Sequence, residues 1–512
     1  MFRWKLAAAG VVVGALALTG CAGGGSSEPT ADAGGLGEKL TIVGTLSPTS
    51  LDAATAGWGN ASPFYQAVYD TLLLATPDGT IEPFLASEWS YNEDNTELTL
   101  TLRDDVTFSD GSALTSEVVK TNLERFKAGT SPDASFLRNL DTVETPDETT
   151  VVLKLSAPDP GMLSYLTRDP GLIASGEAIA ADPEGLATDP IGSGPYILDT
   201  DKTVTGTSYV YSKNDEYWNP DVQHYEELVI NVIPDPTAAL NAIKSGEANG
   251  VRLANNQNLA EVEAAGWTIN AGEINQFGLL LLDRAGTLNP ALGEVKVRQA
   301  INHAFDREAL LTALQKDAGV VNEQTFPPRS AAFDEALNDT YPYDPEKARE
   351  LLAEAGYPDG FVLEMPSTAS VGTTTLNLIT QQLADIGITA QFVDAGNNYV
   401  SDILAAKYAA AWIGLEQTGD WQITQFMIAP TATFNPFHYE DDTVNGLLEE
   451  MQLGDQDAQD AAAAELNEYI LDQAWFAWWY RPQNSYATDA NTQVEMLPTN
   501  NYPAIYDFQP KN

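Results

Sequence analysis

A run of apolar residues near the middle of the chain, Phe277 to Asp283, is too short and too hydrophobic for anything but a buried strand. After a turn-rich gap, Val297, Ile301 and Phe305 fall on one face of a helix. Asp306 then occupies the position of a cap for a second helix. This order indicates either one more strand–helix unit of an α/β domain or the passage of the chain from one lobe into another.

Strand and helix patterns also alternate before this region. Leu228 to Ile233 reads as a strand, after which Asp235 and Pro236 start a helix that Gly246 ends. Such a strand-to-helix unit is typical of an α/β domain.

The length of the chain indicates how many domains to expect, and its charge excludes one class of binding partner. A chain of 512 residues exceeds the size of a single core, so two or three domains are expected. The 73 acidic residues outnumber the 25 basic ones and give a net charge of -48. Because such a surface repels phosphate backbones, nucleic-acid binding is excluded.

The N-terminus has the layout of a secretory signal. Arg3 and Lys5 precede an apolar segment from Leu6 to Leu18, which is shorter than a membrane-spanning helix. The next residues, Leu18-Thr19-Gly20-Cys21, resemble the bacterial lipoprotein cleavage box. We therefore expect a signal peptide at 1–20, lipidation of Cys21, and a Gly/Ser-rich tether at 21–38. Cys21 is the only cysteine, so neither a disulfide nor a thiolate metal site is expected.

A longer pattern begins near Thr80. It resembles the early signature of the family 5 extracellular solute-binding proteins of bacterial ABC importers, which bind dipeptides, oligopeptides and nickel. The residues that stand in the signature positions are Pro83, Leu85, Ala86, Ser87, Trp89, Leu102, Arg103, Asp104, Val106, Phe108, Asp110, Gly111, Val118 and Val119. Later segments follow the family's order, so that the resemblance covers the chain from about residue 40 to the C-terminus.

The resemblance implies an α/β, two-lobed periplasmic-binding-protein-like fold. The family has class II-type topology and belongs to the large cluster with an extra subdomain, and its mixed sheets form two hinge-linked lobes around a cleft. The chain would leave the first lobe near Glu273 to Asp283 and return near Trp475 to Tyr486. The implied boundaries are 39–276 for the first lobe with a β-rich subdomain at about 80–188, 277–478 for the second lobe, and 479–512 for the return.

The family's cleft loops point to candidate ligand contacts. The loop before the first helix indicates Trp58, Gly59 and Asn60, and the segment after a strand at Ala409 to Ile413 indicates a second wall. The candidates on that wall and in the following loop are Trp412, Glu416, Asp420, Trp421 and Asn435. Core packing is the competing interpretation for each tryptophan.

One departure from the dipeptide-binding members changes the expected solute. Those members hold the ligand carboxylate with an arginine shortly after a Met-Pro pair, and Met365 to Thr375 contains no arginine. We therefore expect a longer peptide held by its backbone, or a neutral or cationic solute stacked on tryptophan. Glu416 or Asp420 would receive an amine or hydroxyl. The arginines that remain for a carboxylate are Arg252, Arg284, Arg329 and Arg481.

Catalytic and metal-binding patterns are missing from the sequence. His224, His303 and His438 lie far apart, and the His224–Glu227 pair is more typical of a surface than of a metal site. Gly192-Ser193-Gly194 lacks the spacing of a nucleophile elbow. We expect no catalytic residue, no metal ligand and no cofactor.

The sequence thus predicts the monomeric substrate-binding lipoprotein of an ABC importer. It would be extracytoplasmic and anchored to the membrane through Cys21, and would deliver a peptide or other small solute to the ABC permease subunits. The alternatives are a secreted hydrolase, or a binder of a non-peptide solute such as an oligosaccharide or a metal chelate.

Overall fold

The computed structural model describes residues 36–77 and 79–511. The expected signal peptide, Cys21 and nearly all of the expected tether lie outside the described residues. Among the described helices, none is both long enough and apolar enough to cross a membrane.

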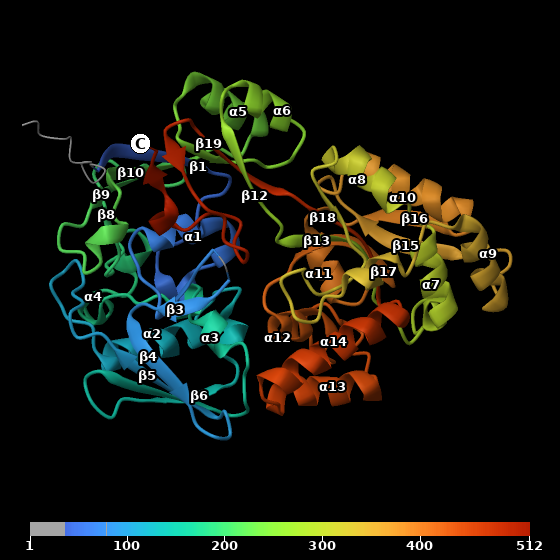
Figure 1. The fold of residues 1–512 in the computed structure, drawn as a ribbon, viewed down its shortest axis with the longest axis horizontal. Coiled ribbons are helices and arrows are strands. Elements are labelled where there is room, and N and C mark those ends of the chain that lie inside the picture. Colours follow the sequence, from blue (N-terminus) through green and yellow to red (C-terminus); the bar gives the residue numbers. More distant parts are fainter. Residues whose placement is uncertain (1–35, 78, 512) are drawn as a thin grey trace, which may run out of the picture. The chain divides into compact units, whose positions relative to one another are not determined.

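A mixed seven-stranded sheet brings together distant parts of the chain in the order β12-β19-β11-β1-β10-β9-β8 (Figure 1). β1 lies parallel to β10 and β11, whereas β9 and β19 run antiparallel to their neighbours. The strands are β1 (Gly37–Gly44), β8 (Tyr196–Leu198), β9 (Ser208–Lys213), β10 (Tyr225–Val232), β11 (Gly250–Arg252), β12 (Thr268–Gly272) and β19 (Asn484–Thr488).

The helix after β10 forms as its sequence predicts. In α5 (Pro236–Ser245), the carboxylate of Asp235 accepts a hydrogen bond from the backbone N–H of Ala238 at 2.8 Å. Gly246 ends the helix with a φ of 70°, a conformation that glycine adopts without strain. Two further helices accompany the sheet, α1 (Trp58–Gln66) and α6 (Leu259–Ala264).

A smaller antiparallel sheet, in the order β4-β5-β7-β6, follows in the chain. Its strands alternate buried and exposed residues, and the buried side packs on helix α2 (Ser116–Ala128) through a cluster that includes Leu98, Val119 and Leu153. The strands are β4 (Ala86–Tyr91), β5 (Glu97–Leu102), β6 (Leu140–Glu144) and β7 (Thr150–Leu155), preceded by the hairpin β2 (Leu73–Ala75) and β3 (Ile81–Pro83). Short helices α3 (Met162–Tyr165) and α4 (Gly176–Ala181) follow.

A four-stranded sheet in the order β14-β18-β13-β17 is built on the central apolar run. That run becomes β13 (Asn275–Leu281), in which Leu279 to Leu281 are fully buried, as the pattern predicts. The helices α7 (Val295–His303) and α8 (Arg307–Gln315) follow, and the carboxylate of Asp306 accepts from the N–H of Ala309 at 3.0 Å. The other strands are β14 (Gly319–Val321), β17 (Ala410–Glu416) and β18 (Phe476–Pro482).

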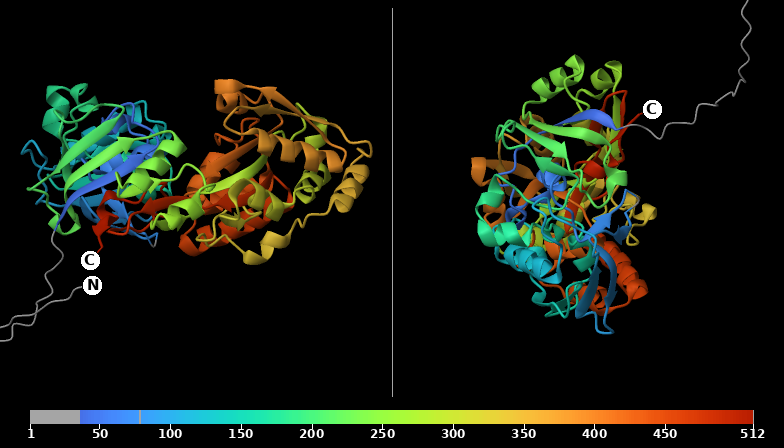
Figure 2. Two further views of the ribbon diagram at one scale, coloured as in Figure 1. Left: turned by 90° about the horizontal axis from the view of Figure 1, so that it is seen from above. Right: turned by 90° about the vertical axis from the view of Figure 1, so that its left-hand side faces the viewer.

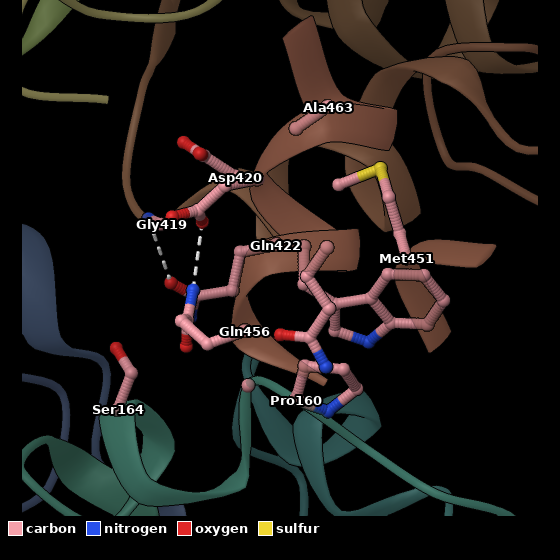
Figure 3. Close-up of a pocket in the computed structure, with 12 residues that line it drawn as sticks. Pro160, Ser164, Gly419, Asp420, Gln422, Met451, Gln456 and Ala463 are labelled. Atoms are coloured by element: carbon pink, nitrogen blue, oxygen red, sulfur yellow. Dashed lines mark hydrogen bonds between the residues drawn. The ribbon is translucent and has the colours of Figure 1, made fainter. Parts of the chain in front are cut away.

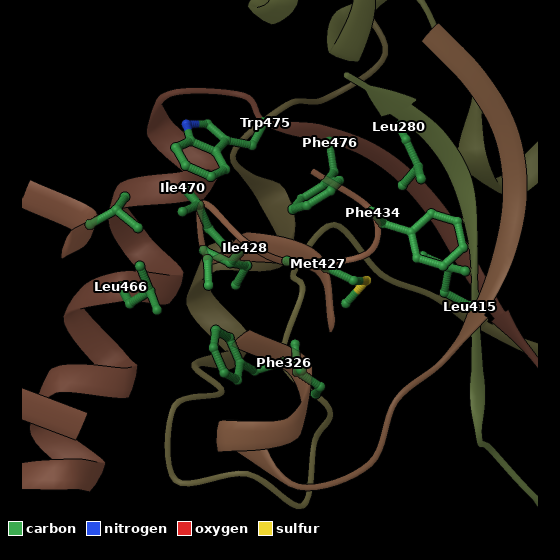
Figure 4. Close-up of a cluster of buried hydrophobic side chains, with 14 of the residues drawn as sticks. Leu280, Phe326, Leu415, Met427, Ile428, Phe434, Leu466, Ile470, Trp475 and Phe476 are labelled. Atoms are coloured by element: carbon green, nitrogen blue, oxygen red, sulfur yellow. The ribbon is translucent and has the colours of Figure 1, made fainter. Parts of the chain in front are cut away.

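Both faces of this sheet are covered by apolar side chains. One face packs on α7 and α8, and the other on α14 (Gln456–Asp472), where Leu466 and Ile470 meet Trp475 and Phe476 (Figure 4). A parallel pair of strands, β15 (Val362–Ser367) and β16 (Thr389–Asp394), and the helices α9 (Pro345–Glu354), α10 (Thr373–Asp385), α11 (Tyr399–Leu404), α12 (Asp420–Ile423) and α13 (Asp442–Leu453) complete this part of the chain.

The chain passes between the seven-stranded sheet and the β13 sheet at two places. It leaves between Gly272 and Asn275, where β12 gives way to β13, and returns at Gln483, where β18 gives way to β19. Both passages can be followed in Figure 1 and from two further directions in Figure 2. We call the part built on the seven-stranded sheet the first lobe and the part built on the β13 sheet the second lobe.

Candidate functional site

The first turn of α1 faces the end of strand β17. Trp58, Gly59 and Asn60, expected in a loop before the helix, form this turn themselves. A Cβ atom placed on Gly59 would lie 3.9 Å from the Oε2 atom of Glu416. The free N–H groups of a helix start favour a nearby negative charge. The structure therefore places Gly59 of the first lobe close to Glu416 of the second lobe, and both were predicted as ligand contacts.

Arg168 also lies beside Glu416, although the sequence did not indicate it as a site residue. It lies after α3, immediately before the short 3-10 segment Asp169–Gly171, and is only 5% exposed. Its Nη1 atom lies 3.9 Å from Oε1 of Glu416. Its Nη2 atom lies 3.9 Å from Oδ2 of Asp133. These distances exceed those of a hydrogen bond. Arg168 belongs to no sequence motif. Only the scarcity of basic residues in this chain, 25 against 73 acidic ones, could have drawn attention to it.

Hydrogen bonding at this charge cluster is incomplete. Neither Nε of Arg168 nor Oε1 of Glu416 has a hydrogen-bond partner among residues 36–77 and 79–511. Burial raises the pKa of Glu416, and the positive charge of Arg168 opposes this effect. Burial lowers the pKa of Arg168, but the negative charges of Glu416 and Asp133 outweigh burial and raise it. The cluster can therefore accept a polar group that completes its bonds.

A cavity of about 170 Å³ opens beside Arg168 and Glu416. Phe136, Phe426 and Phe434 contribute aromatic surface to its wall, and the rings of Phe426 and Phe434 pack edge to face at 4.9 Å. A single π-helical turn, Thr424–Ile428, carries Phe426 into this position, and such turns are frequent at functional sites. We call this space the Glu416 cavity; it combines apolar walls with a few charged groups, as small-molecule sites do.

Asp420 occupies a separate position. It opens α12, its Oδ2 atom accepts a hydrogen bond from Ser330 Oγ at 2.7 Å, and it lines a second cavity (Figure 3). Burial raises the pKa of Asp420, while the Ser330 hydrogen bond and Arg329 lower it. Of the two acidic candidates, Glu416 lies at the unsatisfied charge cluster and Asp420 does not.

The predicted tryptophans are packed into the protein. Trp58 is 3% exposed and belongs to the core beneath the seven-stranded sheet. Trp412 lies within β17 itself, because that strand continues to Glu416, and its ring packs 5.3 Å from that of Phe277. Trp421 is 8% exposed and lines the second cavity. Core packing thus accounts for much of the surface of all three rings.

Asn435 differs from its expected role as a cleft contact. Its side chain is fully buried, its oxygen accepts from Arg284 Nη1 at 3.1 Å, and its nitrogen donates to the carbonyl of Tyr439 at 2.9 Å. Because these internal bonds use both ends of the carboxamide, Asn435 organises its own loop.

Each of the four arginines named as carboxylate partners already has a contact within the protein. Arg284 stacks 4.2 Å from the ring of Trp475, and Arg252 donates to Asn60 Oδ1 at 3.3 Å. Arg329 donates to the backbone oxygen of Thr418 at 3.1 Å, and Arg481 donates to that of Phe326 at 3.0 Å. Burial, followed by the charge of Arg329, lowers the pKa of Arg481 to about 9.

The described part of the chain contains no group of three or more His, Cys, Asp or Glu side chains placed to hold a metal ion. Glu227, which the sequence paired with His224, lies 3.6 Å from Lys39 and 3.8 Å from Lys202. Glu227 thus forms ion pairs with two lysines at the surface.

The family model for the bacterial extracellular solute-binding proteins of family 5 matches residues 80–436, which is more than half of the chain. This chain is a family 5 solute-binding protein. The match confirms the family resemblance, whose signature positions begin at Pro83. The family 5 proteins are the substrate-binding components of ABC importers, act outside the cytoplasm, and are binding proteins rather than enzymes.

Individual relatives match different shares of this family 5 protein. Heme-binding protein A of Haemophilus influenzae is 32% identical over 327 residues, so the chain spans 58% of that relative's length. The glutathione-binding protein GsiB of Salmonella typhi is 27% identical over 429 residues, which are 78% of this chain and 80% of GsiB. The periplasmic binding protein DppA from Helicobacter pylori, solved with the peptide STSA, has a TM-score of 0.76 at 21% identity and covers 93% of this chain and 99% of its own. This likeness confirms the two-lobed, mixed α/β fold.

Proposed function

We propose that this family 5 protein captures a peptide between its lobes and delivers it to an ABC permease. The observation that carries the proposal is the meeting of α1, Arg168 and Glu416 beside a cavity, where Oε1 of Glu416 lacks a hydrogen-bond partner among the described residues. A bound amino group would donate to Glu416, whose buried Oε1 atom has no hydrogen-bond partner among the described residues, with the carboxylate of Asp133 nearby on the other side of Arg168.

The shape of the Glu416 cavity supports a peptide that begins with an apolar residue. Phe136, Phe426 and Phe434 would contact that side chain, while the α-amino group would lie at the carboxylates. The relatives support the same solute class, because GsiB is named for glutathione and DppA was solved with a peptide. Both of those ligands combine an amino group with peptide bonds.

We infer that the solute is enclosed by movement of the lobes about the two strand passages. We place the first lobe at 39–274, with its subdomain at about 80–188, and the second lobe from Asn275 instead of 277, because β13 begins there. The return to the first lobe is placed at Gln483, because β18 remains in the β13 sheet up to Pro482. Hinges of this kind are short segments that absorb backbone rotation.

Anchoring at Cys21 is part of the proposal, supported by Leu18-Thr19-Gly20-Cys21. Cys21→Ala should abolish the diacylglyceryl mass on the N-terminal peptide and leave the protein uncleaved or released from membranes. Retention of that lipid mass in the variant would contradict the anchor.

Native mass spectrometry of protein purified without refolding tests the solute. We expect peptide masses that leave the protein on denaturation and that rebind intact, with a more compact particle in small-angle scattering when they are bound. Co-purification of an oligosaccharide or metal chelate, together with no binding of short peptides, would contradict the proposed peptide function.

A further inference from the structure

Two further cavities adjoin the Glu416 cavity, and residues of both lobes line each of them. The cavity at Asp420, of about 200 Å³, shares Gln422 with the Glu416 cavity (Figure 3). A third, of about 350 Å³, shares Pro160, Gln456 and Gln459 with the cavity at Asp420. We call the second and third spaces the α14 cavities, since residues of α14 line both. A row of adjoining cavities fits an elongated molecule better than a compact one.

Gln422 stands where the Glu416 cavity meets the α14 cavities. Its side chain is 4% exposed, and its Oε1 atom accepts from the backbone N–H of Gly419 at 3.2 Å. Its Nε2 atom has no acceptor among the described residues. Because a buried N–H without an acceptor is unfavourable, a solute carbonyl at this junction would complete the bonding of Gln422.

The α14 cavities have a one-sided charge. Their lining includes the carboxylates of Asp159, Asp420, Asp455 and Asp460, and none of the described residues that line them is Lys, Arg or His. Each of these carboxylates already accepts one internal hydrogen bond: Asp159 from Asn139 at 2.9 Å, Asp420 from Ser330 at 2.7 Å, Asp455 from the backbone N–H of Ala458 at 3.1 Å, and Asp460 from Gln456 at 2.7 Å. A negatively charged group of a solute would find no cation in this lining, whereas a neutral or positive group would meet favourable partners.

We propose that the solute is an elongated peptide whose backbone carbonyl bonds Gln422 and whose segment in the α14 cavities carries no negative charge. This inference rests on the proposed peptide function and adds to it a length and a charge requirement. A free dipeptide would place its terminal carboxylate close to these cavities and bind weakly. A longer chain, or one with lysine or arginine at this point, would bind well.

The test uses tetrapeptide amides that begin with phenylalanine and differ only at the third position, which is lysine, alanine or glutamate. Calorimetry on the full protein should give the lysine and alanine peptides the tighter binding, with the glutamate peptide weaker by about tenfold or more. Equal affinities for the lysine and glutamate peptides would overturn the charge requirement while leaving the peptide function in place. Failure of all three peptides to bind, with binding of a non-peptide solute, would overturn both.

Two variants test whether Asp460 causes the charge preference at the third peptide position and whether Gln422 binds a peptide carbonyl. Asp460→Asn should reduce the lysine-to-glutamate affinity ratio several-fold, whereas Asp457→Asn, an exposed neighbour on α14, should leave the ratio unchanged. Gln422→Met should weaken the tetrapeptides about fivefold to tenfold and leave binding of phenylalanine-initiated dipeptide amides unchanged. An unchanged ratio in Asp460→Asn, or equal losses for dipeptide and tetrapeptide in Gln422→Met, would contradict the inference. Thermal melts of each variant establish that it is folded.

Discussion

Asp70 and Glu416 are both carboxylates inside the protein, but their surroundings differ. Asp70 is fully buried in the first lobe and accepts hydrogen bonds from neutral donors on all sides. The donors are Ser193 Oγ at 3.0 Å, Tyr217 OH at 3.0 Å, Trp218 Nε1 at 2.8 Å and Tyr506 OH at 3.2 Å. These bonds join the segment after α1 to the Gly192–Gly194 turn, to the segment before β10 and to the C-terminal segment.

Glu416 has a cation but lacks that set of donors. Arg168 stays at 3.9 Å, and Oε1 has no hydrogen-bond partner in the described chain. Both carboxylates have a raised pKa, caused first by burial. A raised pKa therefore does not distinguish a structural carboxylate from a ligand anchor, whereas the completeness of the hydrogen bonds does.

The largest expected effect is on binding at Glu416. Glu416→Gln should weaken peptide binding by about 2–5 kcal/mol, because the ligand ammonium loses its charged partner, and should leave thermal stability nearly unchanged. Calorimetry with the peptide recovered from native protein measures this loss. The control Glu468→Gln removes an exposed carboxylate on α14. Unchanged affinity in Glu416→Gln would remove this residue from the site.

Asp70→Ala should instead act on stability. Each buried donor that loses its acceptor costs about 1–3 kcal/mol, so we expect the free energy of unfolding to fall by about 4 kcal/mol. Urea denaturation followed by tryptophan fluorescence measures this change. Affinity for the peptide should stay within twofold of the original, and a selective loss of binding with full stability would reverse the assigned roles.

The pH dependence of stability provides a smaller test. Burial raises the pKa of Asp70 from 3.8 to about 6 in the folded protein, so the folded state binds the proton more tightly than the unfolded state. Its contribution to stability is fully present below pH 3.8 and is lost as the pH rises through about 6. The loss amounts to about 3 kcal/mol. As the pH rises through this window, the free energy of unfolding of the original protein should fall relative to that of Asp70→Asn. If the difference between the two free energies does not change with pH, the raised pKa of Asp70 is contradicted.

The smallest effect separates the two acidic candidates. Asp420→Asn should change affinity for the alanine tetrapeptide amide by about 1 kcal/mol or less, because Ser330 already donates to this carboxylate and the residue lies away from Arg168. The same calorimetric series measures it. A loss equal to that of Glu416→Gln would move the amine-binding position to Asp420.

Local sequence determined the elements whose signals lie within a few residues. The run at β13 became a buried strand, and Asp306, Asp235 and Gly246 ended up at the helix ends where they were expected. Each of these outcomes depends on apolar periodicity or on a hydrogen bond to a neighbouring N–H, which short segments encode by themselves. The two-lobed fold was predicted from the family resemblance, because the hydrophobic pattern alone did not decide whether the central strand lies within one domain or leads from one lobe into the other.

Only the tertiary structure decided which side chains meet. Arg168 carries no motif, yet folding places it between Asp133 of the first lobe and Glu416 of the second. Asn435 follows a family cleft pattern, yet its carboxamide is enclosed by Arg284 and its own loop. Contacts between residues far apart in the chain depend on the packing of whole sheets and on the burial of each charge, neither of which leaves a periodic signal in the sequence. Short segments of sequence therefore determined the helices and strands, whereas the packing of the two lobes against each other determined which residues form the site.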